Sequence, residues 1–211
     1  MNDEDDDQPA DALADQPSGK SRKRRQGPRK VTRQYLENSA AHYLGRFAAS
    51  KAHLRRLMMQ KVKRSESHHG TDSVEGAGFV DEVIAKFERL GFLNDTTYAE
   101  MMARSLHGKG TPLKGIRYKL AGKGIGEDDM EKALAALEDE VRSSNLDLAA
   151  ALVLARRRRL GPFLSDDREI RDARRDKDMA VMARAGFSYD VVLQVLDADS
   201  VEELELAVYG D

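Results

Sequence analysis

Clustered lysines and arginines are the residues of this sequence whose types and spacing could do chemistry, and that chemistry would be the binding of anions. The first cluster lies between residues 104 and 123 and holds Arg104, Lys109, Lys114, Arg117, Lys119 and Lys123. Tyr118 stands among them, one helical turn from Lys114. A cation beside an exposed aromatic ring can bind a phosphate while the ring stacks on a base. The alternative is a solvated helix face with Tyr118 packed on a neighbouring unit, since runs of charge are usually exposed to water.

The second cluster is the run Arg156, Arg157, Arg158 and Arg159. Cations in the last turn of a helix are stabilised by the negative end of the helix dipole, which is a purely structural explanation for the run. Four successive residues nevertheless span more than one face of a helix, so some of these side chains must point away from any core. The candidate residues for binding a partner protein or DNA are therefore Arg104, Lys109, Lys114, Arg117, Tyr118, Lys123, Arg156, Arg157, Arg158 and Arg159.

Catalytic and metal sites are not indicated by the sequence. The chain has no cysteine, which excludes a disulfide scaffold, a thiolate zinc site and a cysteine nucleophile. Its five histidines are scattered and do not stand at the spacing of metal ligands. Gly108 and Gly110 lack the strand context and the further glycine that a dinucleotide-binding loop requires. We expect no catalytic residue, no cofactor and no metal, and hence a protein that is not an enzyme.

The N-terminal segment segregates its charge. Residues 1–19 hold seven carboxylates and no base, whereas residues 20–30 hold seven bases and no acid. Because almost no large apolar residue offsets the entropy of ordering, residues 1–31 are predicted to form a disordered, acidic-then-basic tail. Its basic half could contact nucleic acid as a flexible arm, and the alternative is a solvated tail.

The sequence also bears on location. The N-terminus lacks the apolar core of a secretory signal, and the longest apolar run, residues 146–155, is too short to span a membrane. We expect a cytoplasmic protein without a membrane partner.

From about Thr32 the chain reads as helical nearly to its end. Apolar spacing and capping residues predict nine helices: near 32–47, 51–62 and 78–90, two between 91 and 126, then 127–141, 146–159, 167–185 and 189–197. Residues 63–77 read as a polar loop, and a short terminal turn is expected after Ser200. Thr111 is expected to cap the fifth helix with Pro112 at its first position. Gly124 is expected to end that helix in a left-handed conformation.

The predicted helices fall into three groups, which we place at residues 32–90, 91–144 and 145–211, the last with a C-terminal extension. A weak internal repeat supports the grouping, because Gly124-Ile125 matches Gly186-Phe187 at an offset of 62. A unit of three helices buries only a small core, so neighbouring units must share faces. The predicted fold is all-α, with three tandem three-helix repeats in an elongated, curved, solenoid-like monomer.

The stretch from Gly91 to Ile125 carries a family resemblance. The pattern GFLND-x-x-YA is followed by Arg104, by a Gly-x-Gly-x-Pro segment and by I-x-x-x-L-x-x-KGI. These four elements, in this order, resemble the RecX family, whose members modulate the RecA recombinase. The resemblance implies tandem three-helix repeats in an extended, bent molecule. It also implies a role in DNA repair and recombination and in the SOS response.

Two functions of different classes follow. The resemblance implies a regulator that binds the RecA–DNA filament and modulates RecA ATPase, filament growth and strand exchange, with inhibition as the expected direction. The alternative is a stand-alone helical module that binds single- or double-stranded DNA without the recombinase. The basic half of the tail favours this alternative, whereas the near-neutral charge of the remaining chain argues against it.

Overall fold

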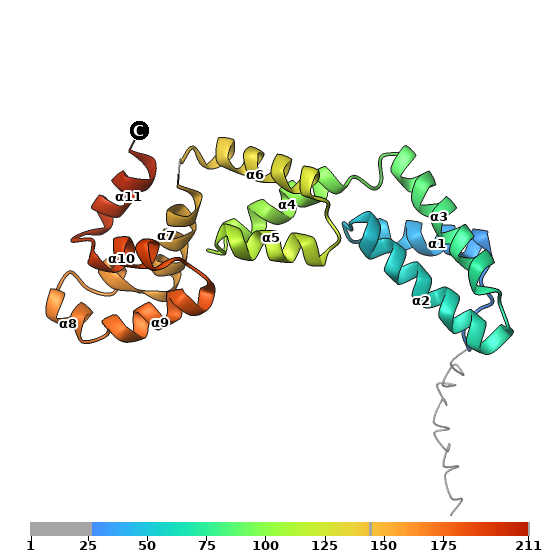
Figure 1. Ribbon diagram of the computed structural model, residues 1–211, viewed down its shortest axis with the longest axis horizontal. Helices are drawn as coiled ribbons and strands as arrows, with labels where there is room; N and C mark the ends of the chain where they lie inside the picture. Colours follow the sequence, from blue (N-terminus) through green and yellow to red (C-terminus); the bar gives the residue numbers. More distant parts are fainter. Residues whose placement is uncertain (1–26, 144, 211) are drawn as a thin grey trace, which may run out of the picture.

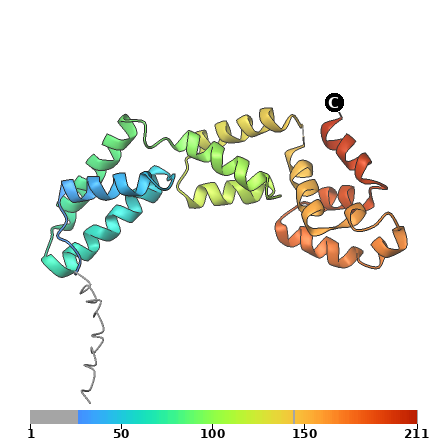
Figure 2. The same ribbon diagram turned by 180° about the vertical axis from the view of Figure 1, so that it is seen from behind.

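The computed structural model describes residues 27–143 and 145–210, which form eleven α-helices and one 3₁₀ helix and contain no strand. The predicted all-α helical-repeat fold is confirmed. Figures 1 and 2 show three groups of helices following one another along the long axis, so the molecule is elongated and bent. The tail predicted for residues 1–31 lies outside the described residues as far as residue 26.

The first group contains α1 (Arg33–Leu44), α2 (Lys51–His69) and α3 (Ser73–Arg89). The side chains of Thr32, Ser50 and Asp72 cap the three helices by accepting backbone N–H groups of their first turns. Apolar residues at helical spacing then form one core, which includes Leu36, Leu54, Met58, Val80 and Val83.

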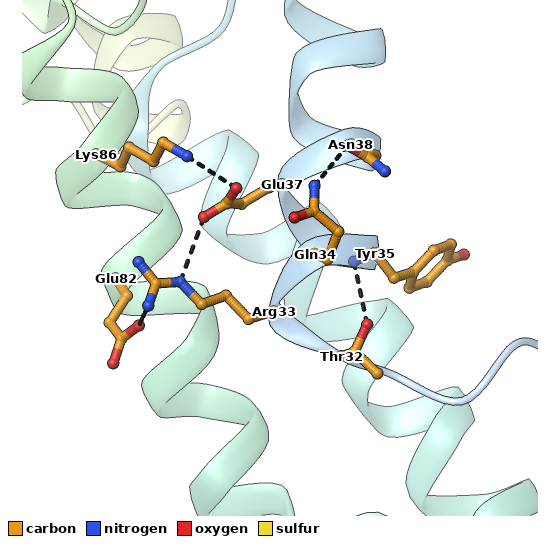
Figure 3. A network of polar contacts seen from close by, with 8 residues as sticks. All are labelled: Thr32, Arg33, Gln34, Tyr35, Glu37, Asn38, Glu82 and Lys86. Carbon is orange, nitrogen blue, oxygen red and sulfur yellow. Dashed lines mark hydrogen bonds and ion pairs between the residues drawn. The ribbon is translucent and has the colours of Figure 1, made fainter.

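An ionic network holds α1 against α3 (Figure 3). Glu37 of α1 accepts from Arg33 at 3.3 Å and from Lys86 of α3 at 2.8 Å, and Arg33 also pairs with Glu82 of α3 at 3.2 Å. The hydrogen bond from Lys86 lowers the pKa of Glu37 below its ordinary value. Tyr35 points away from this network, toward the opposite side of α1.

The polar loop predicted for residues 63–77 is wrong. Helix α2 continues to His69, and only Gly70, Thr71 and Asp72 separate it from α3. The polar residues form the exposed side of the helix, whereas Ser65 is buried and hydrogen-bonds to Thr71. Gly70 ends α2 in a left-handed conformation with φ +63°.

The packed part of the chain begins before Thr32. Val31 is buried, and its backbone N–H donates to Oγ of Ser65 at 2.8 Å. The carbonyl oxygen of Pro28 accepts from Nε2 of His69 at 2.6 Å. Residues 28–31 therefore contact the end of α2, although the sequence placed them in the tail.

The second group contains α4 (Asp95–His107), α5 (Leu113–Gly122) and α6 (Glu127–Val141). Asn94 caps α4, and Gly124 has the expected left-handed conformation with φ +76°. The following residue, Ile125, folds back into a core formed by side chains of all three helices. The bounds of α6 are those predicted, because its apolar face and its acidic first turn are both legible in the sequence.

The predicted start of α5 is wrong in its capping. Pro112 lies before the first helical residue, with extended backbone, and no side chain within the segment caps the helix. The N–H of Leu113 instead donates to Oδ1 of Asp147, at the start of the next group, at 2.7 Å. The cap is supplied across a junction between two groups, which local sequence could not indicate.

The third group is larger than three helices. It contains α7 (Leu146–Arg158), a 3₁₀ turn (Gly161–Phe163), α8 (Arg168–Asp172), α9 (Arg175–Ala185), α10 (Tyr189–Asp197) and α11 (Val201–Tyr209). Leu204 and Val208 of α11 are buried in the same core as α7 and α10. The expected terminal turn is thus a complete helix, which Ser200 caps.

The single helix predicted for residues 167–185 is broken at Ala173 and Arg174. The buried guanidinium of Arg171 donates to the carbonyl oxygens of Ala198 at 2.9 Å and Asp199 at 3.3 Å. These bonds hold α8 against the turn between α10 and α11. Arg159, predicted as the last residue of α7, lies just beyond it with φ +54°.

Candidate functional site

A basic pocket lies where the second group of helices meets the third. Its volume is about 620 Å³. Among the described residues it is lined by Leu106, Lys109, Gly110, Thr111, Lys119, Leu154, Arg157, Arg158, Val181, Arg184 and Ala185. Five of these residues are cations and none is a carboxylate. We call this site the junction pocket.

Contacts between the α4–α5 loop and α7 create the junction pocket. Gly110 has φ +75°, and a Cβ atom there would lie 2.8 Å from the backbone nitrogen of Leu154. Only glycine allows this approach, because other residues would meet both backbone strain and a clash. Nε2 of buried His107 donates to the carbonyl oxygen of Leu146 at 2.9 Å, and Asp147 accepts from Leu113. Lys109 is thereby fixed beside α7.

Helical geometry decides which arginines of the 156–159 run enter the pocket. Arg157 and Arg158 follow Leu154 by three and four residues, so they share its face of α7. Arg156 points elsewhere and forms an ion pair with Glu205 of α11. Arg159 follows the end of the helix and does not line the pocket.

The five pocket cations have a common electrostatic situation. They are Lys109, Lys119, Arg157, Arg158 and Arg184, and none forms an ion pair with another described residue. All five side chains belong to exposed residues, so their charges are hydrated and repel one another only weakly. An anion in the pocket would contact several cations at once and would need no metal or cofactor to hold it.

The remaining candidate residues lie outside the junction pocket. Arg104 pairs with Glu140 at 2.5 Å, and Arg117 pairs with Glu131 and with Glu127. The hydrogen bond with Glu131 raises the pKa of the Arg117 guanidinium. These carboxylates neutralise the two cations, which leaves them poorer anion ligands than the pocket residues.

Lys114, Tyr118 and Lys123 lie along α5 and its end. Tyr118 is 81% exposed. The alternative interpretation required this ring to pack on a neighbouring group of helices, and such an exposed ring does not do so. Lys114 is exposed on the preceding turn. The carbonyl oxygen of Lys123 accepts from Oγ of Ser50 at 2.6 Å, which joins α5 to the first group.

Lys119 and Arg184 are the two pocket cations that the sequence analysis did not select as candidates. Arg184 belongs to neither of the two sequence clusters. It lies in α9, and its Nε donates to the carbonyl oxygen of Ala180 within the same helix. Nothing in the local sequence separates it from Arg174 and Arg175, which pair with acids in the third group. Only the packing of α9 beside α7 assigns it to the pocket. Lys119 was grouped with the first cluster but was not distinguished from its neighbours.

Among residues 27–143 and 145–210, two further classes of site are absent. No group of three or more histidine, aspartate or glutamate side chains is arranged to hold a metal ion. No helix combines the length and the apolar character needed to cross a bilayer.

The fold and the junction pocket define a class of protein. It is an all-α helical-repeat protein in which five cations between two groups of helices form no ion pair with the residues that the structure describes. Residues 94–134 match the family model described as RecX, second three-helix domain. The chain is 39% identical over 184 residues to the regulatory protein RecX of Myxococcus xanthus (strain DK1622). The aligned residues cover 86% of this chain and 96% of the relative. It is 30% identical over 171 residues to the regulatory protein RecX of Agrobacterium fabrum (strain C58), and the aligned residues cover 81% of this chain and 86% of that relative. The chain belongs to the RecX family.

A solved structure supports the fold independently. The crystal structure of RecX from Lactobacillus salivarius matches 82% of this chain and 97% of its own chain. The TM-score is 0.53 at 23% sequence identity. The likeness therefore concerns the path of the backbone and not the individual residues of the junction pocket.

Proposed function

We propose that this chain binds the RecA filament on DNA and inhibits its ATP turnover and growth. The proposal rests on membership of the RecX family together with one observation, the five unpaired cations of the junction pocket. In this proposal the protein acts by binding, as a regulator and not as an enzyme. Its three proposed repeats (32–90, 91–144 and 145–211) act together as one elongated ligand of the filament.

The shape of the molecule supports binding to a polymer. Three groups of helices follow one another along the molecule (Figure 1), so each group can contact a different part of a long partner. A filament offers repeated copies of one surface, so contacts that are individually weak gain affinity when several form on the same chain. The binding of one molecule can then block the addition or movement of several protomers.

The junction pocket supplies the charge for one of these contacts. Lysine and arginine side chains bind phosphate and carboxylate oxygens through charge-assisted hydrogen bonds. A filament of recombinase on DNA offers both kinds of anion. Arg157 and Arg158 provide planar guanidinium groups that suit bidentate contacts, and Lys109 adds a point charge from the α4–α5 loop.

The second candidate function is a stand-alone DNA-binding module. The same cations favour it, since phosphate contacts alone give non-specific DNA binding. The two functions differ in whether the recombinase is required.

Co-sedimentation separates the two functions. The full chain is mixed with single-stranded DNA alone and with the same DNA covered by RecA, at physiological salt. The proposal expects a clearly larger fraction of the chain to pellet with the RecA-covered DNA than with DNA alone, where only direct contacts with the strand can hold it. Equal pelleting with both would favour the stand-alone module.

A further inference from the structure

A second site of different composition lies in the first group of helices, between α1 and α2. Its volume is about 280 Å³. The described residues that line it are Ser39, His42, Tyr43, Arg46, Phe47, Leu57, Met58, Gln60, Lys61 and Arg64. We call it the α1–α2 groove. It lies in a different group of helices from the junction pocket and shares no residue with it.

The groove is basic because the acids of this hairpin face elsewhere. Residues 33–69 contain eight lysines and arginines but only two glutamates. Glu37 is held against α3 by Lys86 (Figure 3), and Glu66 does not line the groove. Arg46, Lys61 and Arg64 form no ion pair with any other residue that the structure describes. The groove therefore presents positive charge that the described chain does not neutralise.

Two aromatic rings stand beside these cations. Phe47 is 52% exposed, and its ring centroid lies 5.3 Å from that of Tyr43. The guanidinium carbon of Arg46 lies 5.5 Å from the Phe47 ring centroid. The half-exposed ring beside cations without an ion-pair partner is a combination that a flat, anionic ligand can use, because a base can stack on the ring while its phosphates meet the charges.

Local structure holds the two rings in place. The N–H groups of Arg46 and Phe47 both donate to the carbonyl oxygen of Tyr43, at 3.0 and 2.9 Å, which forms a tight turn after α1. The hydroxyl of Tyr43 lies 3.1 Å from Nε2 of His53 on α2. The turn and the Tyr43 ring are therefore positioned before any ligand arrives, which limits the entropy lost on binding.

We infer that the α1–α2 groove binds single-stranded nucleic acid, with one unpaired base stacked on Phe47 and the adjoining phosphates on Arg46, Lys61 and Arg64. Stacking needs an exposed base face, which a single strand offers and a duplex hides. The volume suits one base and not a helix. An acidic peptide would satisfy the cations but would leave the aromatic platform without a flat partner.

The test measures binding of a short, fluorescently labelled oligothymidylate by anisotropy, using the full chain without recombinase. A strand of equal length and charge that lacks its bases is the comparison ligand. Because base–aromatic stacking changes affinity by roughly five- to a hundredfold, Phe47→Ala should weaken oligothymidylate binding by at least about fivefold. It should leave binding of the abasic strand nearly unchanged, and Phe47→Trp should retain oligothymidylate binding.

A matched control tests whether any exposed aromatic ring would serve. Phe92 lies between α3 and α4 and is 65% exposed, but its ring packs on that of Phe87 and does not line the groove. Phe92→Ala should bind oligothymidylate like the parent. The combined variant Arg46→Gln and Arg64→Gln should reduce the dependence of affinity on salt for both strands, because two phosphate contacts are lost.

Three results would overturn the inference. The first is equal binding of oligothymidylate by Phe47→Ala and by the parent, and the second is equal binding of the abasic strand and oligothymidylate by the parent. The third is binding of labelled oligoglutamate that depends on Phe47, without such binding of oligothymidylate. The last would assign the groove to an acidic peptide. Repeating the assay with Lys109, Arg157 and Arg158 all changed to Gln removes binding at the junction pocket from the comparison. The inference does not depend on the proposed function, since no step of the test contains the recombinase.

Discussion

The backbone N–H of Leu113 donates a hydrogen bond of 2.7 Å to Oδ1 of Asp147, so that a residue of α7 caps α5 in the neighbouring group of helices. Asp147 also lies in the first turn of its own helix, where a carboxylate is stabilised by the helix dipole. One side chain thus joins the N-terminal ends of two helices and ties the second group of helices to the third.

Loss of this shared cap should destabilise the protein. Asp147→Ala is expected to lower the free energy of unfolding by about 1 kcal/mol, the usual value of an N-cap. Asp147→Asn keeps an acceptor and should cost less. Urea denaturation followed by circular dichroism measures both, and an unchanged midpoint for Asp147→Ala would show that water replaces the side chain at no cost.

Close packing at Gly110 should make it more sensitive than Gly70, a left-handed glycine with open space around it. Gly110→Ala brings a methyl group against the backbone of α7, whereas Gly70→Ala meets nothing within 4 Å although its φ is also positive. Both variants carry backbone strain of about 1 kcal/mol, and overpacking adds roughly 1–3 kcal/mol at Gly110 alone. The difference between the two unfolding free energies isolates the junction. Equal losses would mean that α7 moves aside freely.

The stability of the first group should depend on pH through His53. Burial, followed by the nearby charges of Lys123 and Arg56, lowers the pKa of His53 below its ordinary value of 6.5. The unfolded chain therefore binds a proton more readily than the folded chain, and the free energy of unfolding should fall as pH drops through 6.5 toward the folded pKa.

His53→Gln should flatten this part of the pH profile of unfolding. His68→Gln changes an exposed histidine near the end of α2 and is the matched control. If both variants retain the slope of the parent between pH 7 and 5, a different group causes it.

The sequence predicts most of the helices because their signals are local. The apolar stripe of α6, the caps at Asn94, Ser50 and Ser188, and the left-handed Gly124 all act within one or two turns. The failures have a common cause in contacts between distant segments. Residues 63–69 continue α2, and Ser65 on their buried side hydrogen-bonds to Thr71. Asp147 has the capping role that was expected of Thr111.

The candidate site was predictable in part for the same reason. The arginine run and Lys109 stand out by composition, but that Arg157 and Arg158 enter the pocket depends on which face of α7 meets the α4–α5 loop. The pairing of Arg156 with Glu205 of α11 likewise depends on a distant segment. Arg184 enters the pocket only because α9 lies beside α7. The excess of positive charge on the α1–α2 hairpin is visible in the sequence, whereas its segregation from Glu37 requires α3.

Inhibition of RecA ATPase on single-stranded DNA tests the central claim most directly. The variant with Lys109, Arg157 and Arg158 changed to Gln is compared with one in which the ion-paired Arg104, Arg117 and Arg156 are changed to Gln. Each exposed charge contributes at most about 1 kcal/mol. Three such charges together can therefore change the affinity by up to roughly a hundredfold. We expect the pocket variant to need about tenfold more protein for half inhibition at low salt, and the difference should shrink as salt rises. The matched variant should change by less than about threefold, because its cations already have partners. Equal inhibition by the pocket variant and the parent at low salt, with helicity retained, would contradict the account.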